Sequence, residues 1–169
     1  MLPEVRKILY STDLSKSSTA AFEHASYIAK KTGAKIHILH VVEKLSNEAK
    51  ITLQTYVMDR NVRHDLLQER VHNAEAKLHQ RQENFWDNLH ADELHVRQQI
   101  SSINVVEGFP AETILKYAKE LEVDLIVMGT HGCTGLASVL VGSVAREVIE
   151  LACCPVLAVK TVRDVDMYG

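Results

Sequence analysis

The sequence has few cysteines and no long apolar run. Its three cysteines are Cys133, Cys153 and Cys154. An odd number, with two neighbours, is a poor disulfide framework and favours a reducing compartment. No apolar stretch approaches the roughly 20 residues that a membrane-spanning helix needs. The first residues, MLPEVRKILYSTDLS, lack an uninterrupted apolar core of the signal-peptide type. We therefore expect a cytoplasmic protein without membrane insertion.

The sequence also lacks an excess of positive charge. Its 19 Lys and Arg residues face 22 Asp and Glu residues, which gives a net charge of −3. A weakly acidic chain has no general attraction to nucleic acid or to an anionic membrane, so neither is expected as a partner. Its length suits one core of ordinary size, and no linker, repeat or low-complexity block divides it. Residues 1–169 are predicted to form a single domain.

Short apolar runs alternate with helical patterns along the chain. Five strands are predicted, at residues 5–11, 35–42, 94–107, 124–128 and 155–160. Four helices are predicted, at residues 15–32, 64–89, 110–122 and 143–152. Segment 44–63 has no clean period and is interpreted as a variable connection, in part helical. The alternation predicts a doubly wound α/β fold with a parallel sheet and right-handed crossovers.

Several local features carry smaller predictions. Ser15 or Ser17 is expected to cap the first helix, and Gly33 is expected to end it. The adjacent Cys153 and Cys154 are expected to be buried. The very polar helix 64–89 is interpreted as a solvated face. The nine histidines lack the spacing of a zinc site, so no metal site made by the protein itself is predicted.

Glycines and a hydroxyl residue follow the predicted strand at 124–128. Gly129 and Gly132 are followed, after nine residues, by Gly142 and Ser143, which begins a helix. Glycine permits close approach of the backbone to a ligand, and the first N–H groups of a helix bind anions. Open α/β sheets bind ligands at the carboxyl ends of their strands. The loop over 129–143 therefore predicts a phosphate site, although no Walker G-x4-G-K-[S/T] motif occurs.

This spacing, G-x2-G-x9-G-[S/T], resembles the nucleotide-binding signature of the universal stress protein family. Asp13, which follows the first strand, also matches that family. The segment Gly108-Phe109-Pro110-Ala111-Glu112 resembles the family's G-x-P-x-E turn, and residues 154–159 resemble its final strand. The resemblance covers nearly the whole chain except about 44–92 and the tail. Two departures are Ala145, where many relatives have a hydroxyl residue, and Cys133, where bulkier polar residues are frequent.

The resemblance implies a single doubly wound, five-stranded parallel sheet in the order 3-2-1-4-5, of the adenine nucleotide alpha hydrolase-like type. It implies that adenine is contacted by Asp13 and by the backbone of Val41. It implies contacts to adenine or ribose from Thr12, Met128 and Gly129. It implies phosphate contacts from Gly132, Gly142, Ser143 and Val144, and His131 in the loop is a further candidate. The implied ligand is ATP, or ADP or AMP, with Mg²⁺ or Mn²⁺ held through the phosphates.

Three functions are compatible with these residues. The first is a nucleotide-dependent regulator in a stress response, with no catalytic residue and an unidentified protein partner. The second is a slow ATPase or nucleotidyl-transfer enzyme, for which Asp13 and His131 are the only obvious acid–base candidates. The third is a nucleotide-free dimer that acts through protein contacts. Relatives pair through their final strand, which implies a homodimer through residues 155–160 in this chain.

Overall fold

Five parallel strands form one sheet in the order β3-β2-β1-β4-β5, which confirms the expected topology. The computed structural model describes residues 1–130 and 141–160. The strands are β1 (Lys7–Thr12), β2 (Lys35–Glu43), β3 (Ile100–Gly108), β4 (Leu125–Gly129) and β5 (Val156–Val159). Because β1 lies between β2 and β4, the carboxyl ends of these three strands meet at one edge of the sheet.

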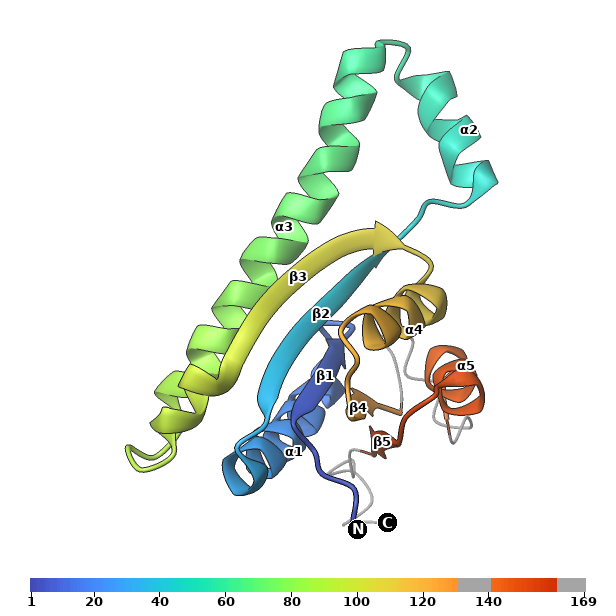
Figure 1. The fold of residues 1–169 in the computed structure, drawn as a ribbon. Coiled ribbons are helices and arrows are strands. Elements are labelled where there is room, and N and C mark those ends of the chain that lie inside the picture. The colour runs from blue at the N-terminus through green and yellow to red at the C-terminus, as the bar shows by residue number, and fades with distance from the viewer. Residues whose placement is uncertain (131–140, 161–169) are drawn as a thin grey trace, which may run out of the picture.

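Helices cover both faces of the sheet (Figure 1). They are α1 (Ser17–Thr32), α2 (Asn47–Tyr56), α3 (Arg60–Asp87), α4 (Pro110–Glu120) and α5 (Ser143–Leu151), with a 3-10 helix η1 (Leu94–Gln99). The inward residues of α1 and of the C-terminal half of α3 share one apolar core. Those of α4 and α5 share the other. Within the described residues, no helix combines the length and the apolar character needed to cross a bilayer.

The central strand β1 supplies side chains to both cores. Ile8 and Tyr10 lie in the core with α1, whereas Leu9 lies in the core with α4 and α5. This is the alternation that a strand imposes on successive side chains, and burial on both sides is typical of a parallel sheet. Phe22 of α1 stacks with Tyr10, and it also meets two aromatic rings of α3. These aromatic contacts join β1, α1 and α3.

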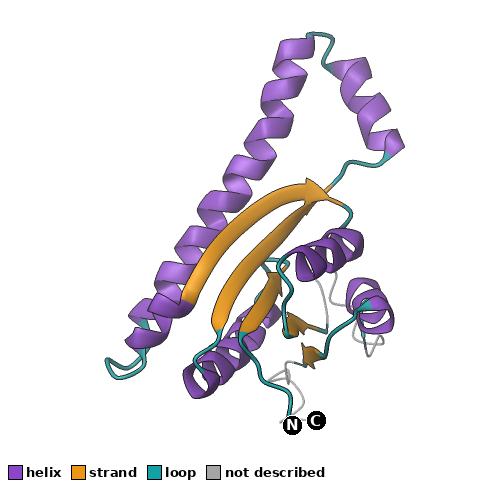
Figure 2. Cartoon of the chain, viewed as in Figure 1, coloured by secondary structure: helices purple, strands orange, loops and turns teal. Residues whose placement is uncertain are grey.

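Residues 47–69, named the arm from here on, form a helical hairpin that projects beyond the sheet (Figure 2). The variable connection is thus mostly helical, and none of the described residues of α2 is buried. Asp59 caps α3 by accepting hydrogen bonds from the backbone N–H groups of Asn61 and Val62, at 2.8 and 3.2 Å. Arg63 Nη1 closes the hairpin by donating to the carbonyls of Val57 and Met58. Local bonds, rather than burial, hold this segment.

The predicted strand at 94–107 is wrong over its first six residues, which form η1. Val96 is buried in the core beside α1, so η1 covers part of that core. Gln99 Nε2 donates to the carbonyls of Ala29 and Ala34, both at 2.8 Å, and joins η1 to the end of α1. Tertiary contacts therefore override the β-forming tendency of this segment.

Two smaller predictions are also corrected. Neither Ser15 nor Ser17 is the N-cap of α1, because Lys16 takes that position without a side-chain bond. Gly33 does end the helix, in the left-handed conformation with φ of 74°, as expected. Cys153 is exposed and Cys154 only half-buried, because both lie in the turn that leads into the edge strand β5.

Candidate functional site

A cavity of about 700 Å³ opens at the carboxyl edge of the sheet. It gathers eight of the ten predicted site residues from four separate segments. They are Thr12, Asp13, Val41, Met128, Gly129, Gly142, Ser143 and Val144. The other two, His131 and Gly132, lie outside the described residues. The cavity lies where the strand order reverses around β1, which is the ligand position typical of open α/β sheets.

The N-terminus of α5 forms one end of this cavity. Gly142 is its N-cap and has extended backbone angles, with φ of −66° and ψ of 161°, and none of the described side chains caps the helix. The N–H of Gly142 already donates to the carbonyl of Thr130, at 2.6 Å. The next N–H groups have no acceptor inside the helix, and its first turn contains no acidic residue. The partial positive charge of the helix end is therefore available to an anion.

The loop between β1 and α1 brings Asp13 to the cavity. Asp13 Oδ1 accepts a hydrogen bond from the backbone N–H of Ser15, at 2.9 Å. The next residue, Leu14, is buried and has a positive φ of 62°, which is uncommon for a residue other than glycine. Its N–H donates to Thr12 Oγ1, and that hydroxyl donates to Ser18 Oγ. These bonds fix the direction of the loop, so the carboxylate is held at the cavity wall.

His40, which sequence reasoning did not select, also lines the cavity. It is buried, and its Nδ1 lies 2.7 Å from the backbone oxygen of Thr12. Burial lowers the pKa of His40 and outweighs the opposite effects of that hydrogen bond and of Asp13. The ring is therefore neutral at pH 7. Because a carbonyl oxygen only accepts, Nδ1 carries the proton and Nε2 is left as a hydrogen-bond acceptor.

Helix α3 supplies further residues that the sequence did not indicate. Arg70, Asn73 and Ala74 line the cavity, although this polar helix was interpreted as a solvated face. Their spacing of i, i+3 and i+4 places them on one side of the helix. The sequence contains this spacing, but it does not state which part of the sheet the helix crosses. Only the packing of α3 on β2 and β3 brings these residues to the site.

Metal-binding side chains do not gather at the site. In residues 1–130 and 141–160, no group of three or more His, Cys, Asp or Glu side chains is arranged to hold a metal ion. A cation at this cavity would therefore need ligand oxygens in addition to those of the described side chains.

Comparisons with known proteins agree with this arrangement. The model of the universal stress protein family matches residues 4–160. Universal stress protein MJ0531 of Methanocaldococcus jannaschii is 36% identical over 160 residues, which cover 92% of this chain and 82% of that protein. A solved structure of MJ0577, from the same organism, has a TM-score of 0.72 at 27% identity and covers 96% of this chain and 100% of its own.

A third relative has the same fold at greater distance. It is a universal stress protein solved in complex with cAMP, with a TM-score of 0.52 and 21% identity, and the match covers 95% of this chain and 100% of that one. The family model spans both cores and every strand of the sheet. The chain therefore belongs to the universal stress protein family.

Proposed function

We propose that this stress protein binds ATP and acts as a nucleotide-dependent regulator of a protein partner. The observation that carries the proposal is the single cavity that joins Asp13 and His40 to the N-terminus of α5. Its volume of about 700 Å³ lies within the range of roughly 300–1,000 Å³ that is typical of small-molecule sites. The cavity is large enough for a nucleotide to reach both ends.

The chemistry of the two ends differs, which gives the nucleotide a direction. The amides of α5 are donors at a positive helix end, so they suit phosphate oxygens. The carboxylate of Asp13 and Nε2 of His40 are acceptors, so they suit the amino group of adenine or the hydroxyls of ribose. In this arrangement the triphosphate lies at β4 and α5, and the nucleoside lies at β1 and β2.

A divalent cation fits the same scheme. Mg²⁺ is commonly bound through substrate phosphates with few protein ligands, and Mn²⁺ shares its preference for oxygen. The described cavity residues supply no cluster of three metal-binding side chains. We therefore propose that Mg²⁺ or Mn²⁺ enters with the phosphates. The relative that was solved with cAMP supports adenine nucleotides as the ligand class, while the assignment to this chain depends on its own cavity.

Replacing Ser143 by proline tests the proposed phosphate end. Proline suits the first position of a helix, and the preceding Gly142 has the extended backbone that proline requires. Ser143→Pro therefore removes one backbone N–H while the start of α5 is kept. Titration calorimetry should show about tenfold weaker binding of ATP, as expected for the loss of a hydrogen bond to a charged group. Binding of adenosine should be unchanged.

Ser143→Ala is the matched control, because it removes the hydroxyl and keeps the N–H. It should lose less affinity for ATP than Ser143→Pro. Equal binding of ATP by Ser143→Pro and the parent protein would contradict phosphate contact at α5. Absence of ATP binding by the parent protein, together with no nucleotide released on denaturation, would instead support the nucleotide-free dimer.

The turnover of ATP separates a regulator from an enzyme. No Walker lysine is present in the sequence, and Asp13 already accepts a hydrogen bond from Ser15. We expect hydrolysis far below the roughly 1 per second that marks the lower end of ordinary enzyme turnover. A rate at or above that value, abolished by Asp13→Ala, would favour the enzyme.

The remaining parts of the proposal concern the oligomeric state and the cellular location. β5 lies at the edge of the sheet, and an exposed edge can pair with a second copy through a symmetric contact. We propose a homodimer through residues 155–160, formed by a single domain in the cytoplasm. Sedimentation equilibrium at micromolar concentration should give a mass near twice the 19.0 kDa of one chain.

A further inference from the structure

Helix α3 presents one small face to the cavity. Arg70, Asn73 and Ala74 form this face, and the short side chain of Ala74 leaves room for a ligand beside the helix. α3 packs on β2 and β3, whereas α5 packs beside β5 and α4. Since β1 lies between β2 and β4 in the sheet, α3 and α5 stand at different ends of the cavity.

The guanidinium of Arg70 is held in place but is incompletely bonded. Its Nη2 donates to the backbone oxygen of Glu43, at 2.9 Å, and Glu43 also lines the cavity. Its Nη1 is enclosed and has no hydrogen-bond partner among the described residues. A buried donor without an acceptor is costly, and more so when the group is charged. Of the five N–H donors of a guanidinium, the two of Nη1 are enclosed and one of Nη2 serves Glu43, so two remain for a ligand in the cavity that Arg70 lines.

Arg70 differs from the arginines near it on the same helix. Arg63 Nη1 donates to two carbonyls of the hairpin turn, and Arg81 Nη1 donates to the carbonyl of Ser15. Among the described residues that line the cavity, Arg70 is the only lysine or arginine. All three arginines donate to carbonyls within the chain, but of the three only Arg70 lines the cavity.

We infer that Arg70 binds the adenine base by donating a hydrogen bond to a ring nitrogen. The inference rests on the proposed function, in which the phosphates lie at α5 and the base lies toward β2. A guanidinium only donates, and the ring nitrogens of adenine accept, so the two are complementary. Asp13 and His40 supply the acceptors for the amino group or the ribose. Arg70 is thus a base-recognition residue that α3 contributes.

The test measures binding of adenosine, AMP and ATP by Arg70→Met. Methionine keeps the apolar stem and removes every donor. A base contact is common to all three ligands, so each should bind about tenfold more weakly, and by the same factor. Arg63→Met is the matched control, two helical turns earlier, and should bind all three as the parent protein does. A loss that grows from adenosine to ATP would overturn the inference, because it would place Arg70 on the phosphates.

A second variant, Arg70→Lys, keeps the charge and can still donate to the Glu43 carbonyl. It tests the base contact if Arg70→Met fails to fold. Its compact ammonium lacks the fork that serves two acceptors at once. The affinity should stay about tenfold weaker, at an unchanged unfolding midpoint without nucleotide. Full affinity in Arg70→Lys would overturn the inference, as would full affinity in a folded Arg70→Met. If the parent protein binds none of the three ligands, the proposed function itself fails.

Discussion

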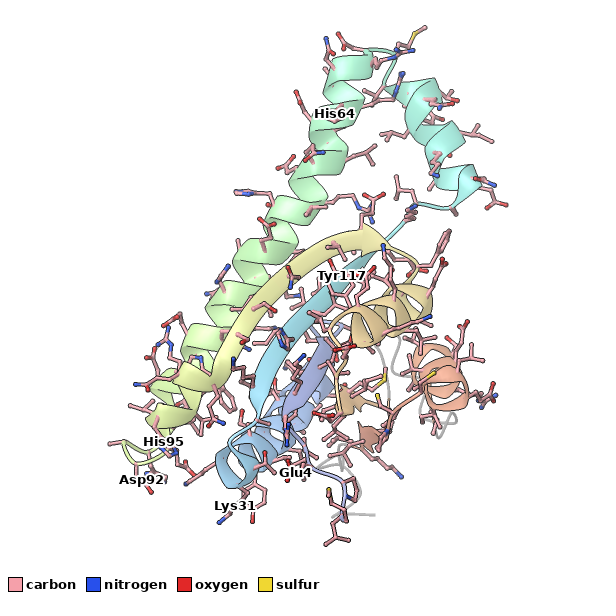
Figure 3. The ribbon with its side chains drawn as sticks, in the orientation of Figure 1. Glu4, Lys31, His64, Asp92, His95 and Tyr117 are labelled. Atoms are coloured by element: carbon pink, nitrogen blue, oxygen red, sulfur yellow. The ribbon has the colours of Figure 1, made fainter. Side chains whose placement is uncertain are left out.

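The two halves of α3 share one continuous helix but are stabilised in different ways. In the C-terminal half, Trp86 is only 3% exposed and meets Phe22 and Phe85 edge to face. In the N-terminal half, which belongs to the arm, Val62 and Leu66 are 46% and 41% exposed. Figure 3 shows His64 on this half, far from the sheet. One half is held by a core, and the other by its cap, its hairpin turn and helical hydrogen bonds.

The difference separates the part of α3 that is fixed against the sheet from the part that projects beyond it. Burial of the aromatic residues fixes α3 against β2 and β3, and this position sets where Arg70 meets the cavity. The arm above Arg70 contributes little to that position, because no described residue of α2 is buried. A substitution in the arm should therefore change the stability of the arm alone, whereas a substitution in the core should change the free energy of unfolding of the whole domain.

The largest expected effect is in the core half. Trp86→Ala removes a fully buried ring and should lower the free energy of unfolding by about 3–5 kcal/mol. Urea denaturation, followed by circular dichroism, measures this loss. The matched arm variant Leu66→Ala should stay within about 0.5 kcal/mol of the parent protein, as exposed substitutions usually do. Similar losses in both variants would mean that the two halves form one cooperative unit.

The second effect concerns His40, a buried histidine of the sheet. The pKa of His40 lies below the ordinary histidine value of 6.5, chiefly because of burial, while nearby Lys77 also lowers it and Asp13 raises it. Below pH 6.5 the unfolded chain therefore binds a proton that the folded chain does not. The stability should fall as the pH drops from above 6.5 through the lowered pKa, by about 1.4 kcal/mol per pKa unit of lowering.

Urea denaturation between pH 5 and pH 8 measures this slope. His40→Gln should flatten it in part, because burial also lowers the pKa of His37, which contributes with the same sign. A slope that is equally steep in His40→Gln would show that this ring is not the titrating group.

The smallest expected effect is confined to the arm. Asp59→Ala removes the cap of α3 and should cost the local helix about 1 kcal/mol. Amide hydrogen exchange in the first turns of α3 should accelerate about fivefold, which corresponds to that energy. The urea midpoint of the domain should not change. Asp65→Ala is the control on an exposed arm position, and a lowered midpoint in Asp59→Ala alone would link the arm to the global transition.

Much of the fold and site could be predicted from the chain because the signals are local. Apolar runs indicated all five strands, and helical spacing indicated α1, α3, α4 and α5. Gly33 ended α1 as expected. The glycines around Ser143 indicated the start of α5, where we propose that an anion binds. His40 was missed because the sequence around a strand histidine does not indicate which residues surround it. Its hydrogen-bond partner, the backbone oxygen of Thr12, lies on another strand. Residues 94–99 were predicted as strand from their local pattern. They form η1 instead, and Val96 packs into the core with α1, which is distant in the sequence.

The sequence by itself determined the order of elements, the parallel sheet and the residues at the carboxyl ends of β1 and β4. Those properties follow from periodicity and from turn residues, which act over a few positions. Only the tertiary structure decided that α3 crosses β2 and β3, so that Arg70 reaches the cavity and the arm does not. A helical period defines which side of a helix is apolar, but its position along a sheet is set by distant aromatic contacts.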